Sequence, residues 1–264
     1  SSQNISIRGV NSLAENSQPL FVVDGVIVDS FDQNANNVVN ISILKNASAT
    51  AIYGSRGANG VVIITTKAGQ AKLDKELSKI QARKNFKETV FFFPQLKTDE
   101  NGKVSFIFTM PEALTRWKLQ LLAHTKDLKS ASKTLQTVTQ KELMVVPNAP
   151  RFLREKDTIT LSAKITNLTN NKLSGSAKIY LTDAITGKSI TKELLTDKNH
   201  PPLSESSVSD RVGFTVDKDG NTNVSWRLSI PEHTQAIQYK IVAKAGNFSD
   251  GEQNVLPVLT NRIL

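Results

Sequence analysis

The side chains that most often do chemistry in proteins are sparse and scattered in this chain of 264 residues. Its three histidines, His124, His200 and His233, lie far apart in sequence, whereas metal ligands commonly come in pairs at short spacing. Cysteine is absent, which removes disulfides, thiolate metal sites and cysteine nucleophiles at once. We therefore predict no metal site, and we interpret the histidines as solvated or strand-face residues.

Motifs that build catalytic sites are also missing. The sequence contains no Gly-x-Ser-x-Gly elbow and no glycine-rich phosphate loop. Residue types alone leave a serine–histidine–aspartate arrangement open, but no spacing favours one. We expect no enzyme activity, no catalytic residue and no cofactor.

Basic side chains are frequent between residues 68 and 84, where a helix is predicted. Leu73, Leu77 and Ile80 fall at positions i, i+4 and i+7, which is one stripe of an amphipathic helix over residues 70–83. This segment is a candidate protease-accessible linker, although proteases need an extended and mobile substrate. Its candidate cleavage residues are Lys72, Lys75, Lys79, Arg83 and Lys84.

The net charge of +9 does not indicate a nucleic-acid-binding protein. No run of basic residues is interleaved with aromatic ones, so we predict no nucleic-acid partner. No stretch of about 18 apolar residues is present, so we predict no membrane-spanning helix. Both ends stop without a start or end signal, and we expect a fragment of a longer chain.

Residues 1–67 mix strand and helix signals. Pro19–Val28 is an apolar strand interrupted by the turn pair Asp24-Gly25, and Ile41–Lys45 alternates like a half-buried strand. Ala47–Tyr53 is a short helix candidate ending at Gly54. The β-branched run Val61–Thr66 predicts a strand that is buried on both faces. Together these elements predict a small α+β unit.

From Phe86 the apolar residues recur every second position. Thr89–Phe93, residues 104–109 and residues 117–124 read as strands, with a turn at Asp99–Gly102. We expect Phe106, Phe108 and Trp117 to lie in the core of a β-sandwich, since burying each ring is worth about 2–3 kcal/mol. Because Phe91, Phe92 and Phe93 are consecutive, at least one of them must point away from that core.

The remaining residues, 139–264, show the same alternation of apolar and polar residues. Short alternating strands such as Thr158–Ile165 and Ser176–Leu181 are separated by turn signals, among them Asp219-Gly220. About seven such strands in this length suit one immunoglobulin-like or fibronectin-like sandwich.

The first unit resembles a known module. Ile7–Leu13, Pro19–Gly25 and the stretch ISILKNASATAIYGSRGANGVVIITTK at residues 41–67 are similar to the second half of the plug domain of TonB-dependent outer-membrane receptors. The resemblance implies the plug fold. The charged residues of this motif, Arg8, Asp24 and Arg56, would contact a ligand or partner, or would form an internal ion pair that fixes a loop. We favour the ion pair.

The second half of the chain resembles another family. Arg83–Pro94, the stretch FIFTMPEALTRW at residues 106–117 and Ala123-His124-Thr125 look like the alpha-2-macroglobulin core motif of bacteria. Residues 152–167 and 247–258 are similar to the opening and close of the next macroglobulin domain. Gly251-Glu252-Gln253 is reminiscent of that family's thioester motif, but a thioester also needs a cysteine, so we expect none here.

The two resemblances imply a mainly β protein, with macroglobulin β-sandwiches preceded by a small α+β plug-like domain. We expect a partial plug-like domain at 1–67, a helical linker at 68–85, the second half of a macroglobulin sandwich at 86–138 and the following sandwich at 139–264. In animal relatives the core motif follows a large insertion that carries the protease bait. The plug-like unit occupies the place of that insertion, so we expect the first half of the sandwich upstream.

The resemblance implies a structural and interaction role in the cell envelope, in the periplasm or at the outer membrane. The expected function is protease inhibition by conformational trapping. The implied partners are proteases, bound through the parent protein, other macroglobulin domains of the same chain, and an outer-membrane protein. The alternative is an outer-membrane receptor or transport component that uses the plug-like domain for docking or ligand binding.

Overall fold

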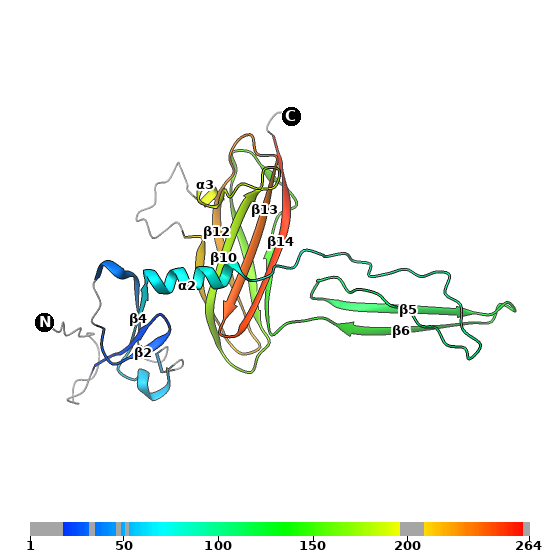
Figure 1. Cartoon of the computed structure of the whole chain (residues 1–264), viewed down its shortest axis with the longest axis horizontal. Helices are drawn as coiled ribbons and strands as arrows, with labels where there is room; N and C mark the ends of the chain where they lie inside the picture. Colours follow the sequence, from blue (N-terminus) through cyan, green and yellow to red (C-terminus); the bar gives the residue numbers. More distant parts are fainter. Residues whose placement is uncertain (1–17, 32–34, 46–48, 51–52, 196–208, 261–264) are drawn as a thin grey trace. The chain divides into compact units, whose positions relative to one another are not determined.

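β-Strands dominate the computed structural model, as the sequence predicts (Figure 1). The structure describes residues 18–31, 35–45, 49–50, 53–195 and 209–260. The chain divides into two compact units, Ser1–Lys79 and Ile80–Leu264. Within the described residues, no helix combines the length and the hydropathy that crossing a bilayer requires.

The N-terminal unit is built on a four-stranded sheet in the order β2-β1-β4-β3. Its strands are β1 (Leu20–Val23), β2 (Val26–Val28), β3 (Val38–Leu44) and β4 (Val61–Thr66). β1 pairs with β2 in antiparallel and with β4 in parallel fashion, while β3 pairs antiparallel to β4. The short helices η1 (Ala35–Asn37) and η2 (Gly54–Gly57) lie in the connections.

The predicted elements of this unit are present wherever the structure describes them, but β3 is more exposed than the predicted half-buried strand, with Ile41 at 53% and Ile43 at 48%. Asp24 and Gly25 form the β1–β2 turn with φ angles of 50° and 86°, and β4 is the most buried strand, as its β-branched residues indicate. Ala49, Thr50 and Tyr53 are helical, and the rest of the predicted short helix lies outside the described residues.

Helix α2 (Lys67–Ser78) follows β4 without a loop. Thr66 is its N-cap and accepts a hydrogen bond from the Gly69 backbone N–H at 3.0 Å. Leu77 is fully buried, as the predicted apolar stripe requires. The helix ends at the Lys79 cap, four residues before Arg83, because the backbone at Arg83 pairs with a strand instead.

The C-terminal unit contains a two-layer β-sandwich. A five-stranded sheet in the order β11-β10-β13-β14-β8 faces a three-stranded sheet in the order β12-β9-β7. A short helix, α3 (Thr191–Leu195), also belongs to this sandwich. The strands are β7 (Leu143–Asn148), β8 (Leu153–Arg154), β9 (Thr158–Asn167), β10 (Leu173–Asp183), β11 (Arg211–Val216), β12 (Asn221–Ser229), β13 (Ala236–Ala245) and β14 (Phe248–Leu259).

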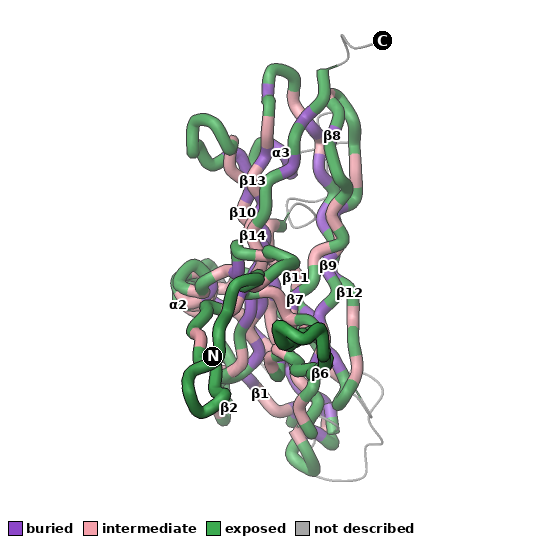
Figure 2. Tube along the Cα trace, turned by 90° about the vertical axis from the view of Figure 1, so that its right-hand side faces the viewer, coloured by how far each residue is buried: buried purple, intermediate pink, exposed green. Residues whose placement is uncertain are grey.

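Alternate residues of both sheets fill one core, as the period-two pattern predicts. Leu161, Ile179 and Ile241 are fully buried, and Trp226 is only 3% exposed. Buried and exposed stretches alternate along β9 and β12 in Figure 2. The Trp226 indole N–H donates to the Asp210 carbonyl at 3.1 Å, so its polar edge is satisfied inside the core. The predicted immunoglobulin-like sandwich within residues 139–264 is therefore present.

Residues 84–139 contain one regular sheet, a two-stranded hairpin of β5 (Arg116–His124) and β6 (Ser130–Val138). Leu119 lies opposite Leu135, and their face of the ribbon also carries Trp117 and Leu121. The residues of the other face are polar, apart from Leu122 and Val138. The hairpin thus has the predicted alternation but a single layer.

Two expectations for this region are wrong. Thr89–Phe93 and residues 104–109 run extended without forming regular strands. Phe106 and Trp117 are half-buried and Phe108 is 43% exposed, so none of the three lies in the sandwich core. The rings lack a core because a single hairpin offers no facing layer to bury them.

The phenylalanines instead form a small cluster of their own. Phe91 packs against Phe93, Phe106 and Phe108 with ring centroids 5.0, 5.1 and 4.6 Å apart. Phe92 points away and is exposed, as the consecutive spacing predicts for at least one ring of that run. The predicted turn at Asp99–Gly102 is present, and the Asp99 N–H donates to the Lys103 carbonyl across it at 2.8 Å.

Candidate functional site

Arg83 is the residue through which the start of the C-terminal unit attaches to its sandwich. Its backbone N–H donates to the Gly251 carbonyl at 2.9 Å, and its carbonyl accepts from the Gln253 N–H at 3.0 Å. These two bonds make a one-residue parallel bridge between Arg83 and Glu252 of β14. The segment is thereby added to the edge of the five-stranded sheet at a single point.

The Arg83 side chain turns inward and forms a buried ionic cluster, which we call the anchor and define as Arg83, Lys141, Asp250 and Glu252. The Arg83 Nε and Nη2 atoms donate to the two carboxylate oxygens of Asp250, both at 3.1 Å. Nη2 also reaches the Val145 carbonyl at 2.7 Å and Glu252 Oε2 at 3.2 Å. Such two-pronged contacts are the strong form of an arginine–carboxylate pair.

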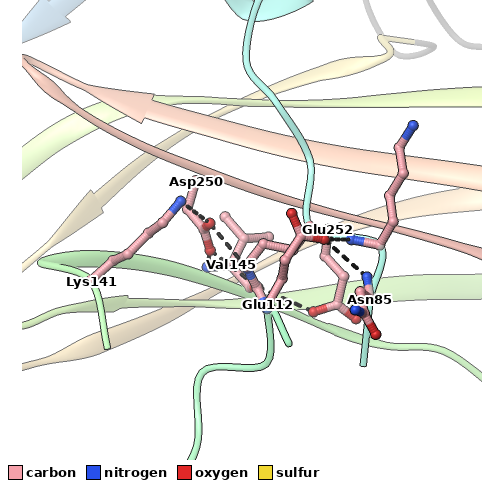
Figure 3. Close-up of polar contacts among 8 residues, drawn as sticks. Asn85, Glu112, Lys141, Val145, Asp250 and Glu252 are labelled. Atoms are coloured by element: carbon pink, nitrogen blue, oxygen red, sulfur yellow. Dashed lines mark hydrogen bonds and ion pairs between the residues drawn. The ribbon is translucent and has the colours of Figure 1, made fainter. Parts of the chain in front are cut away.

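Asp250 is the centre of the anchor. Its side chain is 0% exposed, and besides the two Arg83 bonds it accepts from Lys141 Nζ and from the Val145 backbone N–H, both at 2.9 Å. Figure 3 shows Lys141 and Val145 converging on Asp250. A carboxylate offers about four lone-pair positions, and four donors occupy them. The anchor therefore leaves Asp250 no free position for a metal ion or a substrate.

The environment shifts the proton affinity of two neighbours. Burial raises the pKa of Glu252 above its ordinary value, against the opposing pull of Arg83. Burial, with a smaller contribution from the Glu252 charge, raises the pKa of Tyr239 to about 12. Arg83 also lies over the Phe86 ring, 5.6 Å from its centroid, which adds a cation–π contact.

Glycine at position 251 is required by packing. A Cβ atom there would lie 2.8 Å from Val242 Cγ1 and 3.1 Å from the Ile241 carbonyl oxygen on β13. The Gly-Glu-Gln triplet, which lacks the cysteine of a thioester, has a structural role: Gly251 and Gln253 hold the Arg83 backbone while Glu252 pairs with its side chain.

A second contact holds the residues that follow Arg83. Glu112 Oε2 accepts the backbone N–H groups of Lys84 at 2.7 Å and Asn85 at 2.9 Å, and the Glu112 N–H donates to the Asn85 carbonyl at 2.8 Å (Figure 3). The two backbone donors lower the pKa of Glu112. Glu112 lies just before β5, so this contact ties the start of the segment to the base of the hairpin.

The candidate protease-accessible residues divide into two groups. Lys72, Lys75, Lys79 and Lys84 are exposed. Arg83 is not: its side chain is 8% exposed and paired with Asp250, and its backbone is paired with β14, so a protease cannot reach it in the folded chain. Including Arg83 among the accessible residues is therefore an error, which arises because a basic residue looks the same in sequence whether solvated or paired.

The histidines are not brought together. His124 ends β5 and is exposed, His233 is exposed in the turn before β13, and His200 lies outside the described residues. Among the residues that the structure places, no group of three His, Cys, Asp or Glu side chains is arranged to hold a metal ion.

One of the plug-motif charges, Asp24, makes hydrogen bonds within the described residues. Asp24 accepts hydrogen bonds from the Thr66 backbone N–H and hydroxyl, and Thr66 in turn caps α2. Arg56 is exposed, and Arg8 lies outside the described residues. Asp24 therefore fixes a loop through hydroxyl and backbone donors, and the expected ion pair with Arg8 remains a prediction.

The anchor residues Lys141, Asp250 and Glu252 were missed by the sequence analysis. One signal was available. Asp250 is an even number of residues from the buried Leu256 and Val258, so on a strand its side chain lies on the same, inward face. An ionisable residue at an inward strand position indicates a buried partner. Which of the basic residues supplies that partner depends on tertiary structure.

Two family models match the chain. Residues 89–179 match the Alpha-2-macroglobulin family, and residues 1–61 match the TonB-dependent Receptor Plug Domain. Both resemblances drawn from the sequence are thus confirmed, each for its own part of the chain.

Relatives divide in the same way. TonB-dependent receptor P26 of Formosa agariphila is 51% identical over 69 residues, which is 25% of this chain and 7% of that protein. TonB-dependent receptor SusC of Bacteroides thetaiotaomicron is 47% identical over 76 residues, 25% of this chain and 8% of that protein. Alpha-2-macroglobulin of Thermotoga maritima is 26% identical over 181 residues, 69% of this chain and 10% of that protein. The chain therefore spans a small part of each of these relatives.

Solved structures that are similar to this chain include trypsin-activated alpha-2-macroglobulin from Escherichia coli. The similarity has a TM-score of 0.49 at 13% sequence identity and covers 79% of this chain and 14% of that chain.

Proposed function

We propose that this chain is a non-catalytic structural and interaction segment of an envelope-associated alpha-2-macroglobulin-like protein that inhibits proteases by trapping them. Cleavage of the parent protein changes how its sandwiches pack, and this segment transmits that change. Its partners are proteases, reached through the parent protein, and the neighbouring macroglobulin domains. No cofactor takes part.

The observation that carries this proposal is a single-layered hairpin region in the same unit as a complete two-layered sandwich. The region 86–138 exposes large apolar side chains, among them Ile107 at 95%. On one face of the hairpin, Leu121 and Leu135 are 39% and 46% exposed beside Trp117 and Leu119. Apolar side chains gathered on one exposed face mark an interaction site. We assign this region as the second half of a macroglobulin sandwich, whose first half is supplied by another part of the parent protein.

The proposed domain plan follows from this assignment. Residues 1–67 form the partial plug-like domain, 68–85 the helical linker, 86–138 the half-sandwich and 139–264 the following sandwich. The plug-like domain is then an insertion between the two halves of one macroglobulin domain.

The linker is the proposed place where a protease acts. Lys72 and Lys75 lie within α2 and need local unwinding before cleavage, whereas Lys79 and Lys84 lie beyond its last turn. A cut after Lys79 separates the N-terminal unit from the C-terminal unit, while Arg83 keeps the new end bound to β14. Cleavage there would free one module without unravelling the sandwich.

Limited trypsin digestion followed by small-angle scattering tests this role. On the parent protein we expect an early cut at Lys79 and a change in the radius of gyration that follows the cut. The matched control is the Lys79→Gln variant, in which both that cut and the change in the radius of gyration should be absent. A complete cut that leaves size and shape the same would refute the protease-sensing role.

A second candidate is an outer-membrane receptor or transport component, which the identity of 51% to a TonB-dependent receptor over the N-terminal part favours. In that case the plug-like unit docks an outer-membrane protein or binds a ligand. Crosslinking in intact cells discriminates the two: capture of an outer-membrane protein through the N-terminal unit supports the receptor role, and capture of an added protease by the parent supports inhibition.

A further inference from the structure

On the outer edge of β14, a neighbouring segment forms a single backbone bridge, and the parallel pairing stops there. We call each such residue pair a rung. β13 pairs with the inner edge of β14 along Phe248–Pro257, and β8 pairs with its outer edge only at Val258 and Leu259. Before that point, the outer edge is met by Arg83 through the bonds to Gly251 and Gln253.

The geometry of parallel strands fixes where the next rung would form. Two residues further along each strand, the Asn85 N–H would donate to the Gln253 carbonyl and the Asn85 carbonyl would accept from the Val255 N–H. In the structure three of these groups have substitute partners. Glu112 takes both the N–H and the carbonyl of Asn85, and the Asn254 side-chain oxygen accepts the Val255 N–H at 2.8 Å.

We propose that the outer edge of β14 at Gln253–Val255 is a strand-acceptor site, that its occupant is the segment Lys84–Lys87 of the same chain, and that Glu112 holds the site open. The segment has two mutually exclusive arrangements: held by Glu112, or zipped onto β14 from the rung that Arg83 already provides. This inference does not depend on the proposed function.

The two arrangements are close enough in free energy for a modest force to choose between them. Each arrangement exchanges hydrogen bonds for hydrogen bonds, and the net contribution of one such bond to stability is small. The bonds of Arg83 to Gly251 and Gln253 already hold the segment beside β14, so pairing of the next residues requires no new loop closure. An open sheet edge also favours pairing with any strand that is held beside it.

The device couples the hairpin to the sandwich. Glu112 lies on the connection that enters β5, so a displacement of β5 and β6 pulls its carboxylate away from Lys84 and Asn85. The freed segment then closes on β14 and draws Phe86 and the residues after it toward the sheet. Movement of one module becomes a change of strand pairing in the other.

An engineered disulfide tests the zipped arrangement, because the chain has no cysteine of its own. In the Asn85→Cys, Asn254→Cys variant the two cysteines lie opposite each other only when the next rung forms. Adding Glu112→Ala, which removes the competing acceptor, should raise the rate of disulfide formation at least tenfold. Adding Glu112→Gln, which keeps one acceptor oxygen, is the matched control and should raise it much less. Equal rates with alanine and glutamate at position 112 would overturn the proposal.

Amide hydrogen exchange gives a second measure on a chain without cysteine. Glu112→Ala should slow exchange of the Val255 N–H several-fold, because that group gains a ladder partner, while Trp226 fluorescence confirms that the sandwich is folded. Unchanged or faster exchange at Val255 would refute the acceptor site. Neither measurement uses a protease or a longer chain, so either result leaves the proposed function to its own test.

Discussion

At the scale of single residues, Asp250 organises the junction between the incoming segment and the sandwich. Four donors from three residues converge on a carboxylate that is shielded from water. Buried ion pairs gain little over apolar replacements, but losing one member leaves the other charge buried without compensation. The anchor is therefore a feature that makes the attachment specific, and it is sensitive to single substitutions.

Replacing Asp250 by alanine should lower the free energy of unfolding by about 3–5 kcal/mol, because Arg83 would remain buried without its main partner. Urea denaturation followed by Trp226 fluorescence measures this loss. Glu232→Gln is the control: Glu232 pairs with Lys156 in full contact with water, and its removal should not change the urea midpoint. Similar effects of both substitutions would contradict the anchor.

Glu252 and Glu112 should titrate on opposite sides of the ordinary glutamate pKa of 4.5. For Glu112 the folded pKa is lowered, so its contribution to stability is present above 4.5 and is lost as the pH falls through the folded pKa. For Glu252 the folded pKa is raised, so the folded state takes up a proton first and stability rises as the pH falls from that pKa toward 4.5. Carboxyl carbon chemical shifts measure both values, and the reverse order would contradict the contacts described.

At the scale of elements, two short segments of similar composition have opposite exposure. Lys79 lies at the solvated end of α2, whereas Arg83, four residues later, is bound on both its backbone and its side chain. The change occurs because the helix stops and the chain pairs with β14 instead. Susceptibility to cleavage should follow this boundary.

Trypsin should cut after Lys79 well before it cuts after Arg83. Mass spectrometry of fragments from short digestions identifies the bonds. In the Asp250→Ala variant, cleavage after Arg83 should appear at early times, because the residue that holds its side chain is gone. Early cleavage after Arg83 in the unmodified chain would show that the anchor is open in solution.

The two tryptophans report the difference between the two-layered sandwich and the single-layered hairpin. Trp226 lies in the sandwich core, while Trp117 is half-buried on the apolar face of the hairpin. The Trp117→Phe variant should lose the red-shifted part of the emission and most of the acrylamide quenching. If the remaining Trp226 is quenched as strongly as the unmodified protein, the sandwich core is not as closed as described.

At the scale of the whole molecule, the chain combines a two-layer sandwich with exposed apolar side chains in residues 86–138. The apolar face of the hairpin carries Trp117, Leu121 and Leu135, and the four-phenylalanine cluster is only partly covered. The relatives are many times longer than this chain. Exposed apolar surface marks an interaction site, which is what the proposed half-sandwich requires.

Extending the polypeptide upstream should cover the hairpin, if the half-sandwich assignment is right. Quenching of Trp117 by acrylamide should then fall toward that of Trp226 in the longer protein. The control is an extension of equal length taken from an unrelated soluble domain, which should leave quenching unchanged. Equal quenching with and without the natural extension would argue against the assignment.

The sequence by itself determined the alternating strands Thr158–Ile165 and Ser176–Leu181 of the sandwich, the turn at Asp24-Gly25, the helix stripe through Leu77 and the two family resemblances. These follow from local periodicity and turn chemistry, which neighbouring residues decide. Only the tertiary structure decided that Phe106, Phe108 and Trp117 lack a core and that Arg83 is buried. Burial depends on whether a second layer and an opposite charge arrive from distant parts of a chain, and Arg83 meets Asp250 across 167 positions of sequence.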